Sequence, residues 1–332
     1  MERRVFGRTG MEFGILGFGC GAVGGLMVRG EAADQERAVA RALDVGVNYF
    51  DTAVMYGMGA SETNLGRVLK ALKPREAYVA TKVRVPSAEF GRIGAYAAES
   101  LDASLGRLGM GSVDIFHLHN GITLAGGGEN LSVAQVLNEV VPAFQKLRDA
   151  GKTRFLGITA VGETEALLRV VDSGAFDSAQ VSYNMLNPSA GQAVPAGYPA
   201  QDYARLFDRT QAMGVGVVGI RVLAGGALSG SHDRHPIASP PPEPIGSAAT
   251  YEGDVDRARR LMPLVAEGHA SSLVEAATRF SITHPAMGTI LVGMAAPQEF
   301  EDALAAVTKG KLPQAALDRL AELSKGFVGE AR

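Results

Sequence analysis

The segment YVATKVRVPSAEFGRIGAYAAESLDASLGRLGMGSVDIFHLH, residues 78–119, combines two kinds of pattern. Residues 78–82 and 113–119 are short apolar runs typical of strands, whereas residues 92–108 repeat apolar side chains at helical spacing. A strand, a helix and a further strand in this order are typical of a parallel sheet. The segment therefore predicts an α/β fold.

The same alternation runs along most of the chain. No stretch between the units changes composition as a linker would, so eight units favour one closed barrel over two open sheets. The predicted strands cover residues 15–18, 48–51, 78–82, 113–119, 153–158, 179–181, 216–220 and 289–292, and the predicted helices cover 32–45, 61–72, 92–108, 133–150, 163–173, 202–213, 254–266, 271–283 and 297–307. We therefore predict a (β/α)₈ TIM barrel that occupies residues 1–332 as a single domain.

Several segments lie outside this alternation. Residues 3–6 and 11–13 flank a Gly-Arg-Thr-Gly turn and predict a short N-terminal β-hairpin. Residues 121–132 and 229–254 are long connections that follow strands, and loops in that position usually form lids or binding walls. The tail, residues 312–332, predicts a short helix with a loose end.

Bulk composition restricts the class of partner. With 46% hydrophobic and 20% charged residues among 332, the chain can bury a large core. Its net charge of -3 provides no positive field for nucleic acid or an anionic membrane, so we expect a small-molecule partner. Cys20 is the one cysteine, no Cys and His cluster has metal-ligand spacing, and residues 13–28 are too rich in glycine for a signal sequence. We expect a cytoplasmic protein with no metal and no membrane span.

Titratable side chains stand where three consecutive predicted strands end. These are Asp51, Lys82 and His119. In a (β/α)₈ barrel the C-terminal ends of the strands meet at one rim, where catalytic groups collect. Tyr56 follows Asp51 in a loop that is able to fold back over this rim. We predict that the four side chains form one catalytic group.

The chemistry of these residues predicts proton transfer to an oxygen atom. A lysine ammonium beside Tyr56 favours the phenolate form, and Asp51 holds that lysine charged and in place. Tyr56 then serves as a proton donor and His119 orients the substrate oxygen, which suits carbonyl reduction or the reverse oxidation of an alcohol. Each residue alone has a structural interpretation: Asp51 as a helix N-cap, Lys82 as a solvated charge, and His119 as a core or loop histidine like His117. The combination of all four favours catalysis.

The order of motifs resembles that of the aldo-keto reductase family. The matching pieces are Asp51-Thr52-Ala53, Tyr56-Gly57, Ser61-Glu62, Leu65-Gly66, Thr81-Lys82, VDIFHLH at 113–119, QVSYN at 180–184 and Leu223-Ala224-Gly225-Gly226. The resemblance reaches to about Val307 and is nearest to the sugar-dehydrogenase-like branch. It implies a tetrad of Asp51, Tyr56, Lys82 and His119, and hydride transfer between a nicotinamide dinucleotide and an aldehyde, ketone or aldose, giving the alcohol or, in reverse, the carbonyl compound or lactone.

The resemblance also implies which positions bind the dinucleotide. By their place in the motifs these are Gly19, Cys20, Asp51, Thr159, Gln180, Arg221, Leu223, Gly225, Gly293 and Gln298, with Gln180 on the carboxamide. Thr159-Ala160 stands where many members have Ser-Asn. Met294-Ala295 replaces the basic or hydroxyl residue that holds a 2′-phosphate. We therefore expect NAD or NADP, with a slight preference for NAD or dual use.

Other interpretations of the same residues are weaker. Residues 19–24 form a GxGxxG pattern, but Gly25 and the run Arg29-Gly30-Glu31 delay any helix to about Ala32, which disfavours a Rossmann domain. An isomerase or lyase on the same barrel would need a phosphate or metal site that the sequence does not contain. A barrel that binds the dinucleotide with little turnover, as a regulatory subunit, is the alternative function.

Overall fold

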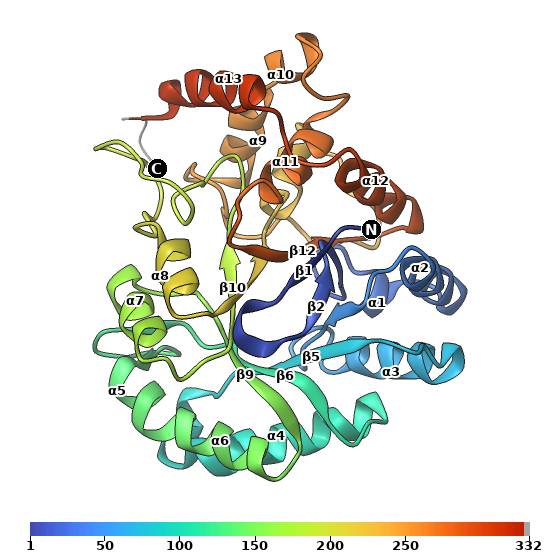
Figure 1. The fold of residues 1–332 in the computed structure, drawn as a ribbon, viewed down its shortest axis with the longest axis vertical. Coiled ribbons are helices and arrows are strands. Elements are labelled where there is room, and N and C mark those ends of the chain that lie inside the picture. Colours follow the sequence, from blue (N-terminus) through green and yellow to red (C-terminus); the bar gives the residue numbers. More distant parts are fainter. Residues whose placement is uncertain (329–332) are drawn as a thin grey trace.

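Eight parallel strands close into a barrel in the computed structural model, which describes residues 1–328 (Figure 1). Neighbouring strands follow chain order around the barrel, and the last strand pairs with the first to close it. The strands are β3 (Leu16–Gly19), β4 (Tyr49–Asp51), β5 (Tyr78–Val83), β6 (Val113–Leu118), β9 (Thr153–Thr159), β10 (Ser178–Ser182), β11 (Gly216–Ile220) and β12 (Met287–Gly293). The predicted (β/α)₈ barrel is confirmed.

Helices form the outer layer around this barrel (Figure 1). They are amphipathic; α2, for example, buries Ala38, Val39 and Ala42. The helices are α1 (Leu26–Arg29), α2 (Ala32–Asp44), α3 (Ala60–Leu72), α4 (Ile93–Leu108), α5 (Val133–Gln135), α6 (Val141–Asp149), α7 (Thr164–Asp172), α8 (Leu206–Ala212), α9 (Tyr251–Arg259), α10 (Pro263–Ala266), α11 (Leu273–Ser281), α12 (Pro297–Thr308) and α13 (Gln314–Ser324). Residues 329–332, the end of the predicted tail, lie outside the described residues.

Two predicted helices have a different form in the structure. The helix predicted over 133–150 contains a π-helical turn at Val136–Val140 between α5 and α6. The helix predicted over 254–266 divides into α9 and α10, because Pro263 has no backbone N–H to continue it. Helix α9 also begins earlier, at Tyr251, because the Thr250 side chain accepts a hydrogen bond from the Gly253 amide at 3.0 Å and caps its start.

The N-terminal hairpin closes the end of the barrel where the strands begin. Its strands β1 (Arg3–Val5) and β2 (Glu12–Gly14) pair antiparallel and lie across the barrel in Figure 1. Phe13 stacks on Tyr49 with ring centroids 4.7 Å apart. Phe6 fits against Gly216, where an added Cβ would lie 2.6 Å from its ring. This end is therefore filled by aromatic packing, which leaves the opposite end of the barrel for function.

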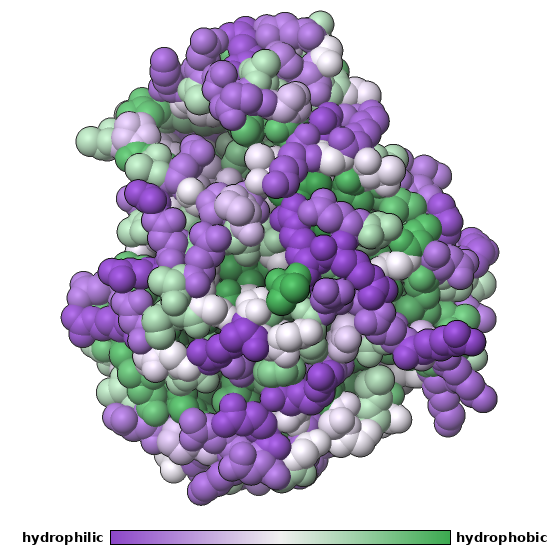
Figure 2. Space-filling view, viewed as in Figure 1, coloured by the Kyte–Doolittle hydropathy of each residue, from purple (hydrophilic) through white to green (hydrophobic). Residues whose placement is uncertain are grey.

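The surface around the hairpin is mixed in character. Figure 2 shows hydrophilic residues over most of this face, with hydrophobic residues in small separate groups. Among residues 1–328, no helix has both the length and the apolar character that a membrane crossing requires.

Candidate active site

Asp51, Lys82, Tyr56 and His119 meet at the open end of the barrel. Asp51 is the last residue of β4, and Lys82 precedes the last residue of β5. His119 directly follows β6, and its amide donates to the Val83 carbonyl at 2.7 Å. Tyr56 lies in the turn after β4, where its amide donates to the Ala53 carbonyl at 3.0 Å. The structure thus brings together the four residues on which the sequence prediction depends.

Lys82 is the centre of this group. Its side chain is fully buried, and its ammonium donates to Asp51 Oδ1 at 2.5 Å, to the Thr52 carbonyl at 2.8 Å and to Tyr56 Oη at 3.1 Å. An ammonium has three N–H donors, so all three are used. Burial alone would lower the pKa of Lys82, but Asp51 and Tyr56 outweigh burial and raise it. Lys82 therefore stays charged at neutral pH.

Asp51 is held in place by further donors. Gln180 Nε2 donates to Asp51 Oδ2 at 2.5 Å, and Tyr49 Oη donates to the same oxygen at 3.3 Å. These contacts come from β10 and from β4 itself. A buried carboxylate with several donors keeps one orientation, so the ion pair with Lys82 has a defined geometry.

Tyr56 keeps its proton at neutral pH. The sequence predicted that Lys82 favours the phenolate, and Lys82 does act in that direction. Burial has the larger effect, however, and it raises the pKa of Tyr56 above its ordinary value of 10. The predicted effect of Lys82 is therefore present, but burial outweighs it. The phenol is the form present at neutral pH, which is the form that can donate a proton.

His119 is neutral over the same range. Burial, Lys82, Arg84 and Arg221 together lower the pKa of His119 to about 3. Its ring meets the Tyr56 ring edge-on, with centroids 6.2 Å apart. Its Nδ1 is buried and has no hydrogen-bond partner among residues 1–328. His117 lies in the barrel wall, where its Nε2 contacts Ser178 Oγ at 3.0 Å and its Nδ1 also has no hydrogen-bond partner among the described residues.

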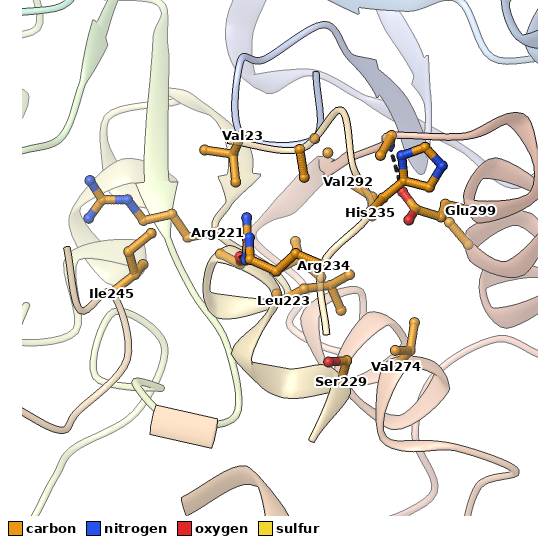
Figure 3. Close-up of a pocket in the computed structure, with 18 of the residues that line it drawn as sticks. Val23, Arg221, Leu223, Ser229, Arg234, His235, Ile245, Val274, Val292 and Glu299 are labelled. Carbon is orange, nitrogen blue, oxygen red and sulfur yellow. Dashed lines mark hydrogen bonds between the residues drawn. The ribbon is translucent and has the colours of Figure 1, made fainter. Parts of the chain in front are cut away.

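A cavity of about 430 Å³ lies at the ends of β11 and β12, and none of the four residues lines it (Figure 3). Four positions predicted to bind a dinucleotide line it: Arg221, Leu223, Gly225 and Gly293. Gly24 also lines it, and an added Cβ there would lie 2.4 Å from the Met294 backbone. The loop after β3 therefore approaches the loop after β12 closely because residue 24 has no side chain.

The long loop after β11 forms one wall of this cavity. Arg234 lines the cavity and donates to the Gly225 carbonyl at 2.8 Å and to Tyr251 Oη at 2.9 Å. Arg29 donates to the Ile237 carbonyl at 2.6 Å, which ties the loop to α1. The buried Asp254 carboxylate accepts hydrogen bonds from the amides of residues 246–248, each at 2.8 Å. These hydrogen bonds hold the loop in one conformation along the side of the cavity.

The six remaining predicted positions are not on the cavity wall: Gly19, Cys20, Asp51, Thr159, Gln180 and Gln298. Gly19 ends β3, in register with Asp51 and Gly293. Thr159 ends β9 in register with Gln180 of β10. Cys20 is buried, with its amide donating to the Asp51 carbonyl at 2.9 Å, and Gln298 is exposed and donates to Asp302 at 3.1 Å.

Two acidic residues that the sequence prediction did not include do line the cavity. Glu299 lies in the first turn of α12, and its carboxylate accepts a hydrogen bond from the Ala295 amide at 2.6 Å (Figure 3). Asp302 lies one turn further along the same helix. Pro297 was the available signal, because proline favours the first position of a helix and so marks the start of α12 directly after the loop that follows β12.

Comparisons with known proteins agree with this geometry. Residues 15–325 match the model of the Aldo/keto reductase family. L-galactose dehydrogenase of Arabidopsis thaliana is 30% identical over 93% of this chain and 89% of that protein. Pyridoxal 4-dehydrogenase of Microbacterium luteolum is 27% identical over 90% of each. The holo form of the aldo-keto reductase AKR11C1 of Bacillus halodurans has the same fold, with a TM-score of 0.73 at 24% identity over 100% of this chain and 98% of that one.

The buried ion pair leads to a prediction about stability. Lys82→Met should lower the free energy of unfolding by about 3 to 5 kcal/mol, because it leaves the Asp51 carboxylate buried without a counter-charge. The double variant Lys82→Met/Asp51→Asn should lose less than the sum of the two single losses, because it removes both charges. Urea denaturation of the four proteins measures the coupling.

The control is Lys152→Met, which removes an exposed ion pair with Asp102 and should change the free energy of unfolding by less than about 1 kcal/mol. Strictly additive losses at Lys82 and Asp51 would contradict the coupling between them.

Proposed function

The chain belongs to the aldo/keto reductase family, and we propose that it interconverts a carbonyl compound and the corresponding alcohol or lactone with a nicotinamide dinucleotide, using Tyr56 as general acid and base. The observation that carries this proposal is the contact of Lys82 Nζ with both Asp51 and Tyr56 Oη. The family and the named dehydrogenases among its relatives support an oxidoreductase.

The residues present fit a nicotinamide dinucleotide. The buried Thr159 hydroxyl oxygen has no hydrogen-bond partner within residues 1–328, and it lies in register with Gln180. A carboxamide group would supply donors and an acceptor to these two side chains. Leu223, Gly225 and Gly293 would hold the rest of the molecule along the cavity. When bound, the dinucleotide supplies the hydride for reduction or accepts it in oxidation.

The residues of the tetrad divide the proton chemistry between them. In reduction, Tyr56 donates its phenolic proton to the carbonyl oxygen as the carbonyl carbon gains the hydride. The Lys82 ammonium, 3.1 Å away, stabilises the resulting phenolate, and Asp51 keeps that ammonium charged. Neutral His119 donates a hydrogen bond that orients the substrate oxygen. Oxidation of an alcohol runs the same steps in reverse, with the phenolate accepting the proton.

We further propose that the protein prefers NAD to NADP. Glu299 and Asp302 line the cavity, so a 2′-phosphate near them would meet two carboxylates. The two arginines that line the cavity would do little to offset this repulsion. Arg234 already donates to three partners, and Arg221 points to the side of the cavity opposite Glu299 (Figure 3). A ribose diol, in contrast, can donate hydrogen bonds to a carboxylate.

The reaction is tested by titrating the protein with NADH and NADPH by fluorescence, and then by assaying aldehydes and aldoses with the dinucleotide that binds. Tyr56→Phe should bind the dinucleotide as the wild type does, and should lose turnover by a factor of roughly 10² to 10⁴, because it removes the proton donor. Binding with no turnover of any compound by the wild type would instead favour the regulatory subunit. Retention of most of the turnover by Tyr56→Phe would contradict its role.

The cofactor preference is tested by Glu299→Gln, which removes one charge and keeps an oxygen for the Ala295 amide. The Kd for NADPH should fall at least about fivefold and the Kd for NADH should change less, because the lost charge repels only the 2′-phosphate. Glu301→Gln is the matched control on α12, since Glu301 pairs with Arg41 away from the cavity. An equal response of both dinucleotides to Glu299→Gln would contradict the assignment.

A further inference from the structure

Arg84 lies at the mouth of the barrel on the same side of the chain as Lys82. Side chains alternate along a strand, so Lys82 and Val83 at the end of β5 face opposite ways, and burial continues to alternate past that end, with Arg84 exposed and Val85 buried. Val83 and Val85 are both buried in the apolar layer that includes Ile93 and Ala97 of α4, which fixes the face they occupy. Lys82 therefore points into the barrel, and the exposed Arg84 continues above it at the rim.

The backbone segment that carries Arg84 lies next to the segment that carries His119. The His119 amide donates to the carbonyl of Val83, the residue before Arg84, at 2.7 Å. Asn120 also bonds to both the amide and the carbonyl of Val85, at 2.8 and 2.7 Å. These contacts hold the chain segments of Arg84 and His119 side by side. The charge of Arg84 also contributes to the lowered pKa of His119.

Arg221 provides a second positive charge at the same rim of the barrel, from the end of another strand. It directly follows β11 and has a φ of +59°, in the left-handed region that residues with a side chain seldom adopt. Asn184 Nδ2 and the Ala224 amide hold this conformation by donating to the Arg221 carbonyl, at 3.0 and 2.8 Å. A strained backbone of this kind is found most often at functional sites. Arg221 also contributes to the lowered pKa of His119.

Both guanidinium groups have unused donors. Within the described part of the chain, neither forms a hydrogen bond or an ion pair, whereas Lys82, Arg29 and Arg234 all do. The acidic residue whose pKa Arg84 helps to lower, Glu129, already accepts hydrogen bonds from the Ser87 hydroxyl and amide. An arginine fork is well suited to bind a carboxylate or a phosphate. The mouth above His119 is therefore lined on two sides by free cations.

We propose that the substrate carries an oxyanion, a carboxylate or a phosphate, away from its reacting carbonyl, and that Arg84 and Arg221 bind this group. This inference rests on the proposed function and adds the substrate class to it. The dinucleotide does not account for Arg84, because Arg84 is not on the wall of the cavity that fits the dinucleotide. Lys82 does not serve as the anchor, because its charge is already paired with Asp51.

Two matched pairs of substrates test the proposal: butanal against succinic semialdehyde for a carboxylate, and glyceraldehyde against glyceraldehyde 3-phosphate for a phosphate. In the wild type, at least one anionic member should have a kcat/KM at least tenfold above that of its neutral partner. Arg84→Gln should remove this preference mainly by raising the KM of the anionic compound. It should leave the neutral compound and the Kd for NADH within about twofold.

The control is Arg75→Gln, an exposed arginine before the start of β5, at the other end of the barrel. It should change neither member of a pair. A second variant, Arg221→Gln, should also reduce the preference for the anion. If Arg221→Gln weakens NADH binding and leaves the preference intact, or if Arg84→Gln affects both members of a pair equally, the two-arginine site is wrong. A wild type that prefers the neutral members would also overturn it.

Calorimetry separates a failure of this proposal from a failure of the proposed function. Inorganic phosphate and succinate are titrated into the wild type and Arg84→Gln, each saturated with NAD. Weaker binding of either anion to the variant supports the site even if no aldehyde is turned over, and equal binding to both proteins overturns it. Absence of NAD binding and of turnover by the wild type would count against the proposed function itself.

Discussion

The buried ion pair between Lys82 and Asp51 is the interaction on which the rest of the site depends. A lysine that is fully enclosed by protein would lose its charge without a partner, and Asp51 supplies that partner at 2.5 Å. Gln180 and Tyr49 hold Asp51 in turn, so three strands contribute to one charge. Because the ammonium also reaches Tyr56 Oη, the ion pair links the barrel scaffold to the residue proposed to move the proton.

The two ends of the barrel have different roles: one stabilises the fold, and the other holds the residues proposed to carry the chemistry. At one end, Phe6 and Phe13 of the hairpin pack into the opening and fill it with aromatic rings. At the other end, Asp51, Lys82 and His119 stand at or beside the ends of their strands, and the loop after β11 lines the cavity. The loop is held by Arg29 and by the Asp254 carboxylate, which form hydrogen bonds with backbone atoms of the loop. Loops of this kind can differ in sequence without changing the barrel beneath them.

Much of this arrangement was predictable because it depends on local periodicity. The alternation of strands and helices predicted the barrel, and a barrel brings the strand ends that carry Asp51, Lys82 and His119 to one rim. The protonation of Tyr56 was not predictable, because it depends on burial outweighing Lys82. The division at Pro263 and the place of Glu299 on the cavity wall depend on packing between distant segments. The place of Arg84 near the rim was predictable, since it comes two residues after Lys82 and just past the end of β5, but its unused donors are visible only in the structure.

The most direct test of this account is the pH dependence of carbonyl reduction by the wild type, measured in a single turnover so that product release does not limit the rate. With the pKa of His119 at about 3 and the pKa of Tyr56 above 10, both groups keep one protonation state across neutral pH. The rate should be level between roughly pH 6 and 9 and fall only at higher pH, as the phenol loses its proton. A loss of activity centred near pH 6.5, or a fall beginning below about pH 8, would contradict a neutral His119 or a protonated Tyr56 respectively.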